Sequence, residues 1–101
     1  MNKKTRQQIE MDFSRAISQA QALEHLADDL SRIANSGVES AFIVLKNSWR
    51  GDAGGSMEPA GKEAINEIYR TADNLMRVAR NIRSTADLVY RAEKQAVELC
   101  I

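Results

Sequence analysis

The chain has little of what disulfide-bonded, metal-binding or β-sheet proteins are built from. Its 101 residues include one cysteine, one proline, five glycines, one tryptophan, two tyrosines and two phenylalanines. A single cysteine, Cys100, excludes an intrachain disulfide and a cysteine-based metal site. So few turn-forming residues, in a composition rich in Ala, Leu, Ile, Arg and Glu, favour long helices over sheets.

An excess of charge of one sign is also missing, because fourteen basic side chains balance fourteen acidic ones. Nothing in this balance points to nucleic acid or to an anionic membrane. No apolar run approaches the roughly 20 residues that would span a bilayer, so we expect no stable membrane insertion. After Lys3, Lys4 and Arg6 the chain continues with Gln8 and Glu10 where a signal peptide needs an apolar stretch, so no ordinary cleaved signal is expected.

Catalytic constellations are absent from the sequence as well. It offers no Ser-His-Asp or Cys-His set, and its central glycines lack the Lys and Ser/Thr of a phosphate-binding loop. His25 has no second His, Cys or suitably placed acid with which to hold a metal ion. We therefore predict that the protein is not an enzyme, with no catalytic residue, no cofactor and no metal.

Two long heptad patterns are what the sequence does contain. In each, apolar or small residues alternate at spacings of four and three, which predicts a helical seam. The first pattern comprises Ile9, Phe13, Ala16, Ala20, Leu23, Ala27, Leu30, Ala34, Gly37, Ala41 and Val44. The second comprises Ala64, Ile68, Thr71, Leu75, Val78, Ile82, Thr85, Val89, Ala92, Ala96 and Leu99.

Between the two patterns lie four of the five glycines and the only proline. We predict one domain, residues 1–101, with a first helix over about 6–47, a turn over about 48–56 and a second helix over about 57–99. A start of the second helix at Asp52 is the alternative, and Pro59 would then bend its first two turns. The fold class is all-α, an antiparallel helical hairpin.

A second set of apolar residues flanks the predicted seams, and a lone hairpin has no surface left to cover it. We therefore expect two hairpins to pair into a four-helix bundle. The predicted dimer stripe comprises Ile17, Leu26, Ile33, Phe42, Ile65 and Met76, accompanied by Ile43, Tyr69 and Tyr90. An apolar stripe fits a homodimer and a heterodimer equally, because pairing selectivity depends on flanking charges.

The tripeptide Trp49-Arg50-Gly51 lies at the midpoint of this pattern. A Trp-x-Gly in the turn of a helical hairpin of about one hundred residues resembles the WXG100 (ESAT-6-like) family, and the resemblance covers the whole chain. It implies a protein made in the cytoplasm and secreted without a cleaved signal peptide, as a folded homo- or heterodimer, by a type VII (ESX-like) secretion system. The implied partners are a second copy or a related WXG100-like protein, and the secretion ATPase. Trp49 and Gly51 would form the recognition motif.

The family's export signal, a Tyr-x-x-x-Asp/Glu pattern after the second helix, is not matched at that place. Tyr90 is followed four residues later by Lys94. Tyr69 and Asp73 have the spacing but fall within the predicted second helix. Tyr69, Asp73 and Tyr90 are therefore weak candidates, and a partner could carry the signal instead.

Other functions remain open at this stage. The protein could act as an export substrate or as an adaptor for a larger secreted partner. It could also be a cytoplasmic coiled-coil interaction or scaffolding module whose Trp-x-Gly is coincidental. A nucleic-acid-binding hairpin is the weakest hypothesis, because no aromatic residues interleave with the arginines and acids such as Asp87 stand four residues before Arg91 to form surface ion pairs. The arginines concerned are Arg70, Arg77, Arg80, Arg83 and Arg91.

Overall fold

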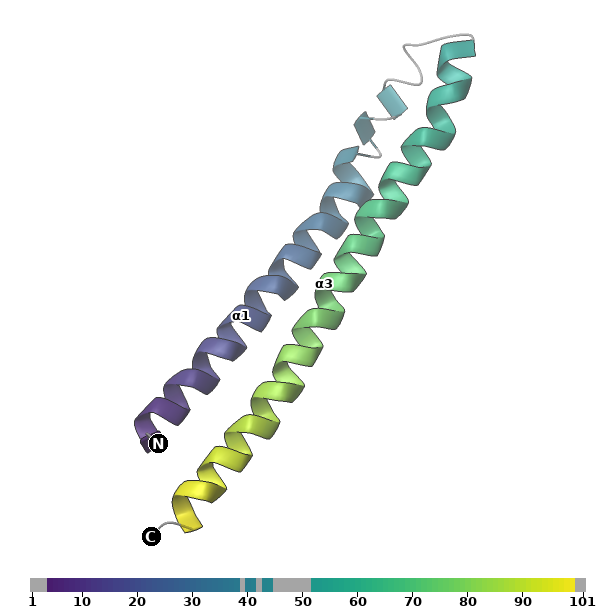
Figure 1. Cartoon of the computed structure of the whole chain (residues 1–101). Helices are drawn as coiled ribbons and strands as arrows, with labels where there is room; N and C mark the ends of the chain where they lie inside the picture. Colours follow the sequence, from purple (N-terminus) through teal and green to yellow (C-terminus); the bar gives the residue numbers. More distant parts are fainter. Residues whose placement is uncertain (1–3, 39, 42, 45–51, 100–101) are drawn as a thin grey trace. The chain divides into compact units, whose positions relative to one another are not determined.

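The computed structural model describes residues 4–38, 40–41, 43–44 and 52–99, with the side chains of 52–58 left out of the description. Its helices are α1 (Arg6–Arg32), the π-helical turn η1 (Ile33–Val38) and α3 (Asp52–Leu99) (Figure 1). No strand occurs among the described residues. The predicted all-α class with two long helices is confirmed.

The chain divides into two units, and each contains part of α1 and part of α3. Unit 1 combines Met1–Glu24 with Met76–Ile101, and unit 2 is His25–Leu75. Within unit 1 the helices run antiparallel, since Lys4 pairs with Glu93 and Glu24 pairs with Arg83. This is the pairing expected of a helical hairpin.

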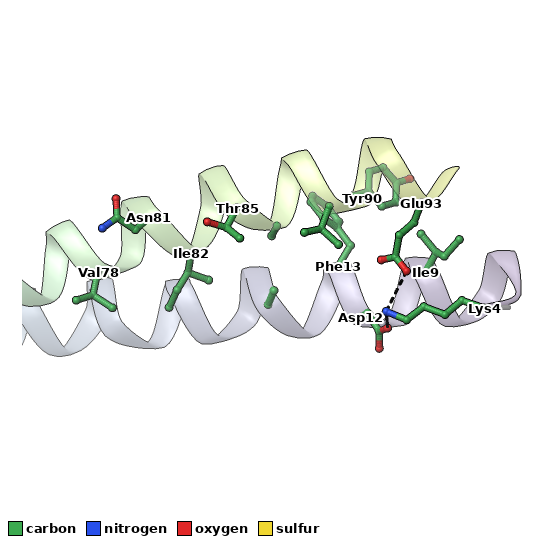
Figure 2. A pocket seen from close by; sticks show the side chains of 13 residues that line it. Lys4, Ile9, Asp12, Phe13, Val78, Asn81, Ile82, Thr85, Tyr90 and Glu93 are labelled. Atoms are coloured by element: carbon green, nitrogen blue, oxygen red, sulfur yellow. Dashed lines mark ion pairs between the residues drawn. The ribbon is translucent and has the colours of Figure 1, made fainter. Parts of the chain in front are cut away.

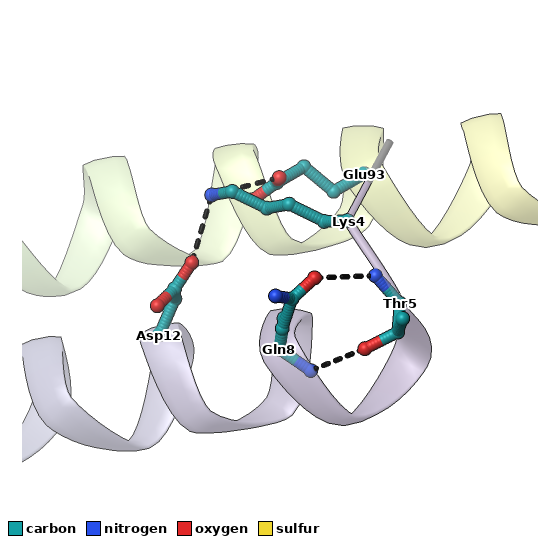
Figure 3. Close-up of polar contacts among 5 residues, drawn as sticks. All are labelled: Lys4, Thr5, Gln8, Asp12 and Glu93. Atoms are coloured by element: carbon teal, nitrogen blue, oxygen red, sulfur yellow. Dashed lines mark hydrogen bonds and ion pairs between the residues drawn. The ribbon is translucent and has the colours of Figure 1, made fainter. Parts of the chain in front are cut away.

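The first helix begins with a capping box. The backbone N–H of Gln8 donates to Thr5 Oγ1 at 3.1 Å, and the backbone N–H of Thr5 donates to Gln8 Oε1 at 2.8 Å (Figure 3). The first turn of a helix has N–H groups without an intrahelical acceptor, and this exchange satisfies one of them. The helix therefore begins at Arg6, as the sequence predicted.

Alanines at heptad spacing form the buried seam. In unit 1, Ala20 and Ala79 are fully buried, together with Ile9. In unit 2, Ala27, Ala34 and Ala72 are buried in the same way. Methyl side chains at a contact let two helix axes approach closely, because nothing larger separates the backbones.

The seam of the second helix lies one residue away from its predicted positions. Thr71, Val78, Thr85 and Val89 are exposed, whereas Ala72 and Ala79 are buried. The predicted Ile68, Leu75 and Ile82 are half-buried and border the observed seam. The prediction was wrong at eight of its eleven positions, which are exposed, because α3 carries two heptad rows side by side and the row of alanines allows the closer approach.

The seam of the first helix also ends earlier than predicted. Gly37, Ala41 and Val44 are exposed, and Val38 is half-buried instead. A π-helical turn, in which the Ser36 hydroxyl donates to the carbonyl oxygen of Arg32 at 2.9 Å, begins at Ile33. Such a turn holds more residues than an α-turn, so it rotates the following side chains away from the heptad register.

The helix boundaries differ from the predicted ones. The regular α-helix α1 ends at Arg32, and α3 begins at Asp52, which is the alternative start. Residues 52–56 of the predicted turn are thus helical, with Pro59 inside α3. Proline removes one hydrogen bond of the helical ladder there. Trp49, Gly51 and Phe42 lie outside the described residues.

Candidate interaction surface

The described residues of the predicted dimer stripe are divided between the two units, with Ile17 and Met76 in unit 1 and the others in unit 2. Leu26 and Ile33 are exposed, whereas Ile17, Ile65 and Met76 are half-buried. Ile17 lies seven residues before Glu24 on α1, and Met76 lies seven before Arg83 on α3. Heptad spacing places such residues on one side of a helix, so Ile17 and Met76 flank the ion pair of Glu24 with Arg83.

An apolar groove lies between the two helices of unit 1. It has a volume of about 430 Å³, and Figure 2 shows the side chains that line it. From α1 come Ile9, Phe13 and Ala16, and from α3 mainly Val78, Ile82, Thr85, Ala86 and Val89. Val78 and Val89 keep 48% and 47% of their surface exposed. The sequence predicted that these valines pack against the first helix in the seam. They do form an apolar row, but they line the groove instead.

One end of the groove is closed by a lysine between two carboxylates. Lys4 Nζ lies 2.8 Å from Asp12 Oδ2 and 3.0 Å from Glu93 Oε2 (Figures 2 and 3). The hydrogen bonds to Asp12 and Glu93 raise the pKa of Lys4, and the bond from Lys4 lowers the pKa of Asp12. All three side chains are partly exposed, so solvent screens this cluster and its net contribution to stability is small.

Polar side chains also bridge the two helices of unit 1. Arg83 donates from Nε and Nη2 to the two carboxylate oxygens of Glu24 at 2.9 and 2.7 Å. This two-point contact raises the pKa of Arg83. A planar guanidinium fits a carboxylate in this geometry better than an ammonium group would. The pair is separated by 59 residues, so no local sequence signal could have revealed it.

Tyr90 also bridges the two helices, nearer the N-terminus of α1, and its side chain lines the groove as well. Its hydroxyl donates to Glu10 Oε1 at 2.6 Å and accepts from Lys94 Nζ at 3.2 Å. Its ring lies 4.4 Å from the ring of Phe13, centroid to centroid. The hydrogen bond to Tyr90, with the charge of Glu10, raises the pKa of Lys94. Tyr90, a weak export-signal candidate, thus has a packing and hydrogen-bonding environment within unit 1.

The other export-signal candidates lie in unit 2. Tyr69 lines a shallow polar hollow of about 510 Å³ with Asp28, Ser31, Arg32 and Asn35. Asp73, four residues further along α3, is exposed. The hollow does not include Asp73 among its lining residues, so these two candidates do not share one cavity.

Several members of the arginine strip are engaged in ion pairs. Arg91 pairs with Asp87, as the sequence predicted, and Arg70 pairs with Glu67. Together with the Arg83 contact to Glu24, these pairs occupy groups that a phosphate would need.

Neither a metal site nor a membrane span is found in the described part of the chain. No cluster of three or more His, Cys, Asp or Glu side chains is arranged to hold a metal ion there. No described helix combines the length and the apolar character needed to cross a membrane. Comparison with family models, with curated proteins and with solved structures finds no match to this chain.

Proposed function

We propose that the protein is a small non-enzymatic protein that a type VII (ESX-like) secretion system exports as a folded dimer. It acts either as the secretion substrate or as an adaptor for a larger secreted partner. The observation that carries the proposal is the tripeptide Trp49-Arg50-Gly51 located in the chain between two long helices, α1 and α3, whose segments pair antiparallel in unit 1. This is the arrangement that gives the resemblance to the WXG100 family its weight.

The apolar groove of unit 1 supports the dimeric part of the proposal. Its valines are half exposed in the single chain, and an apolar face of this kind is covered when two hairpins pair. Recognition by the secretion ATPase is proposed for Trp49, because a tryptophan offers the large rigid contact area on which interfaces depend.

Export from a Gram-positive host with an ESX-like system tests the proposal. The tagged chain is expressed in the parent strain and in a strain without the secretion ATPase, and the culture medium is assayed. We expect the wild-type chain in the medium of the parent only, and a strong loss with Trp49→Ala. Arg50→Ala is the matched control, because it changes the neighbouring residue and leaves Trp-x-Gly intact.

Two results would count against export. The chain could stay inside intact cells of both strains, even with its encoded neighbours co-expressed. That result would support the alternative, a cytoplasmic coiled-coil interaction or scaffolding module. If Trp49→Ala and Arg50→Ala are exported equally well, Trp49 acts only as a packing residue. Folding of each variant is checked by circular dichroism before its export is compared.

A further inference from the structure

The alanine seam of α3 changes character in unit 2. Its buried row of alanines reaches Ala72, and seven residues earlier the same row holds Ile65, which is half-buried. The matching row of α1 stays small, because the buried Ala27 and Ala34 are followed at heptad spacing by Ala41. The isoleucine therefore interrupts a pattern of methyl side chains.

Heptad spacing sets Ala41 of α1 against Ile65 of α3. The two helices run antiparallel within unit 2 (Figure 1), and residues of both line its polar hollow. In an antiparallel pair, seven residues forward on one helix correspond to seven residues backward on the other. One heptad beyond the buried pair Ala34 and Ala72, a regular α1 would thus bring Ala41 to the level of Ile65.

The structure keeps Ala41 out of the seam. Ala41 and Val44 are both exposed, and Val44 keeps 63% of its surface accessible. The π-helical turn η1 accounts for this, because its extra residue shifts the following helix by one position, a rotation of about 100°. The local sequence permits the shift, since Ser36 and Gly37 are weak helix formers.

Side-chain volume explains why the shift occurs at this level. Paired alanines let two helix axes approach closely, whereas an isoleucine in the same row holds them further apart. An alanine facing the isoleucine fills little of the wider gap and gains few contacts. Turning Ala41 away from the seam therefore costs little opposite Ile65, and it would cost more opposite an alanine.

We infer that η1 is a two-state register switch whose state is set by the volume of the side chain at position 65. With Ile65 the turn is π-helical and Ala41 faces solvent. With a small side chain at that position, residues 33–38 wind as a regular α-helix, and Ala41 and Val44 rotate toward α3, where the heptad pattern alone would place them. Val44 precedes Trp49 by five residues, so the switch acts close in the chain to the tripeptide on which the proposed function rests.

Thiol labelling at two neighbouring positions reports the register. Cys100→Ser removes the native thiol, and Ala41→Cys or Ser40→Cys then supplies one new thiol. Both positions are exposed in the π-helical state, so the two thiols should react at similar rates when Ile65 is present. Ile65→Ala should slow the reaction at position 41 by about tenfold or more, because burial in the seam blocks the reagent until the helix opens locally.

The thiol at position 40 is the matched control. In the α-helical state it occupies the heptad position of Ile33, which is exposed beside the buried Ala34. Its reaction rate should therefore change by less than about twofold with Ile65→Ala, because a local opening is not needed to reach it. Circular dichroism of every variant checks that the helices are retained.

Deletion of Gly37 separates a rotation from a general tightening of the seam. Without Gly37, Ala41 follows Ala34 by six residues, and a regular α-helix no longer returns it to the seam row. The thiol at position 41 should then react quickly both with Ile65 and with Ile65→Ala. Slow labelling that persists in the shortened chain would show closure around a smaller side chain and would overturn the switch.

Two further results would also overturn the switch. One is equal labelling at position 41 with Ile65 and with Ile65→Ala. The other is faster labelling at both positions with Ile65→Ala, which would show a frayed helix end and no rotation. These rates are measured on the purified chain at one protein concentration and do not depend on secretion, so the export assay remains a separate test of the proposed function.

Discussion

Units 1 and 2 pack their helices in the same way and differ in what surrounds the packed seam. Both bury alanines at heptad spacing, Ala20 and Ala79 in unit 1 and Ala27 and Ala72 in unit 2. Unit 1 adds a capping box and ion pairs that join its two helices. In unit 2, α1 gives way to a π-helical turn containing Gly37, and the ion pairs of Arg32 and Arg70 stay within one helical turn. The buried alanines are thus common to both units, and in unit 1 polar bridges also join the two helices.

The largest expected effect comes from enlarging a seam alanine in each unit. Ala79→Leu and Ala72→Leu should each lower the free energy of unfolding by about 1–3 kcal/mol, because the added atoms separate backbones that methyl groups hold close. Ala92→Leu, on an exposed position of the same helix, is the control and should change stability little. Urea denaturation followed by circular dichroism at one fixed protein concentration measures all three.

The same variants also show in which unit stability is lost. Hydrogen exchange should show the loss of protection first in the unit that carries the substitution. Equal losses would support one packing mode in both units. A negligible loss at Ala72 with a large one at Ala79 would mean that the seam of unit 2 can relax and that the units are not equivalent.

The sequence predicted the packing of the first helix well and that of the second only in part. From Ile9 to Ala34 one apolar row dominates, so the periodicity alone located the seam. On α3 the rows containing Val78 and Ala79 have the same period, and the more hydrophobic row was chosen. Side-chain volume decided otherwise, because helices packed through alanines approach more closely. Periodicity reports that a face is apolar and does not report which neighbour covers it.

Whether a polar contact could be predicted depends on how far apart its two residues lie in the sequence. The capping box of Thr5 and Gln8 has a recognisable local pattern, Thr-x-x-Gln, although it was not used in the prediction. Arg91 with Asp87 follows from helical spacing and was predicted. The contact of Glu24 with Arg83 depends on how the two helices are rotated relative to each other. Because the predicted seam of the second helix was wrong, this rotation could not be derived from the sequence. The groove was missed for the same reason.

An intermediate effect, with the opposite sign, is expected at the π-helical turn of unit 2. A Cβ added at Gly37 would meet nothing within 4 Å, and the residue does not require a left-handed backbone. Gly37→Ala should therefore raise the free energy of unfolding by about 0.5–1 kcal/mol, through the lower backbone entropy of the unfolded chain. Gly37→Val should give a smaller gain because its side chain is restricted in a helix. Thermal denaturation measures both, and a loss of stability with Gly37→Ala would show that the turn needs glycine.

The smallest expected effect is a pH dependence at the end of the groove in unit 1. The ammonium group of Lys4 lowers the pKa of Asp12 below its ordinary value of 3.8. A carboxyl whose pKa is lower in the folded state stabilises the fold above its unfolded pKa, and this contribution disappears as the pH falls through the folded pKa. Asp12→Asn should therefore reduce stability slightly at neutral pH, and the difference from wild type should vanish well below pH 3.8.

The matching lysine variant distinguishes the ion pair from a general effect of acid. Lys4→Gln removes the main partner and leaves only the charge of Arg15 to lower the pKa of Asp12, so Asp12→Asn made in that background should change the pH dependence less. Because Lys4 also contacts Glu93, Lys4→Gln alone should cost more than Asp12→Asn alone. Urea midpoints of the four chains at neutral and acidic pH complete the cycle. A difference in stability between wild type and Asp12→Asn that persists undiminished in acid would assign the role of Asp12 to packing at the groove and not to its charge. The capping box and the bridges of Glu24 and Tyr90 would then remain as the polar contacts that stabilise unit 1.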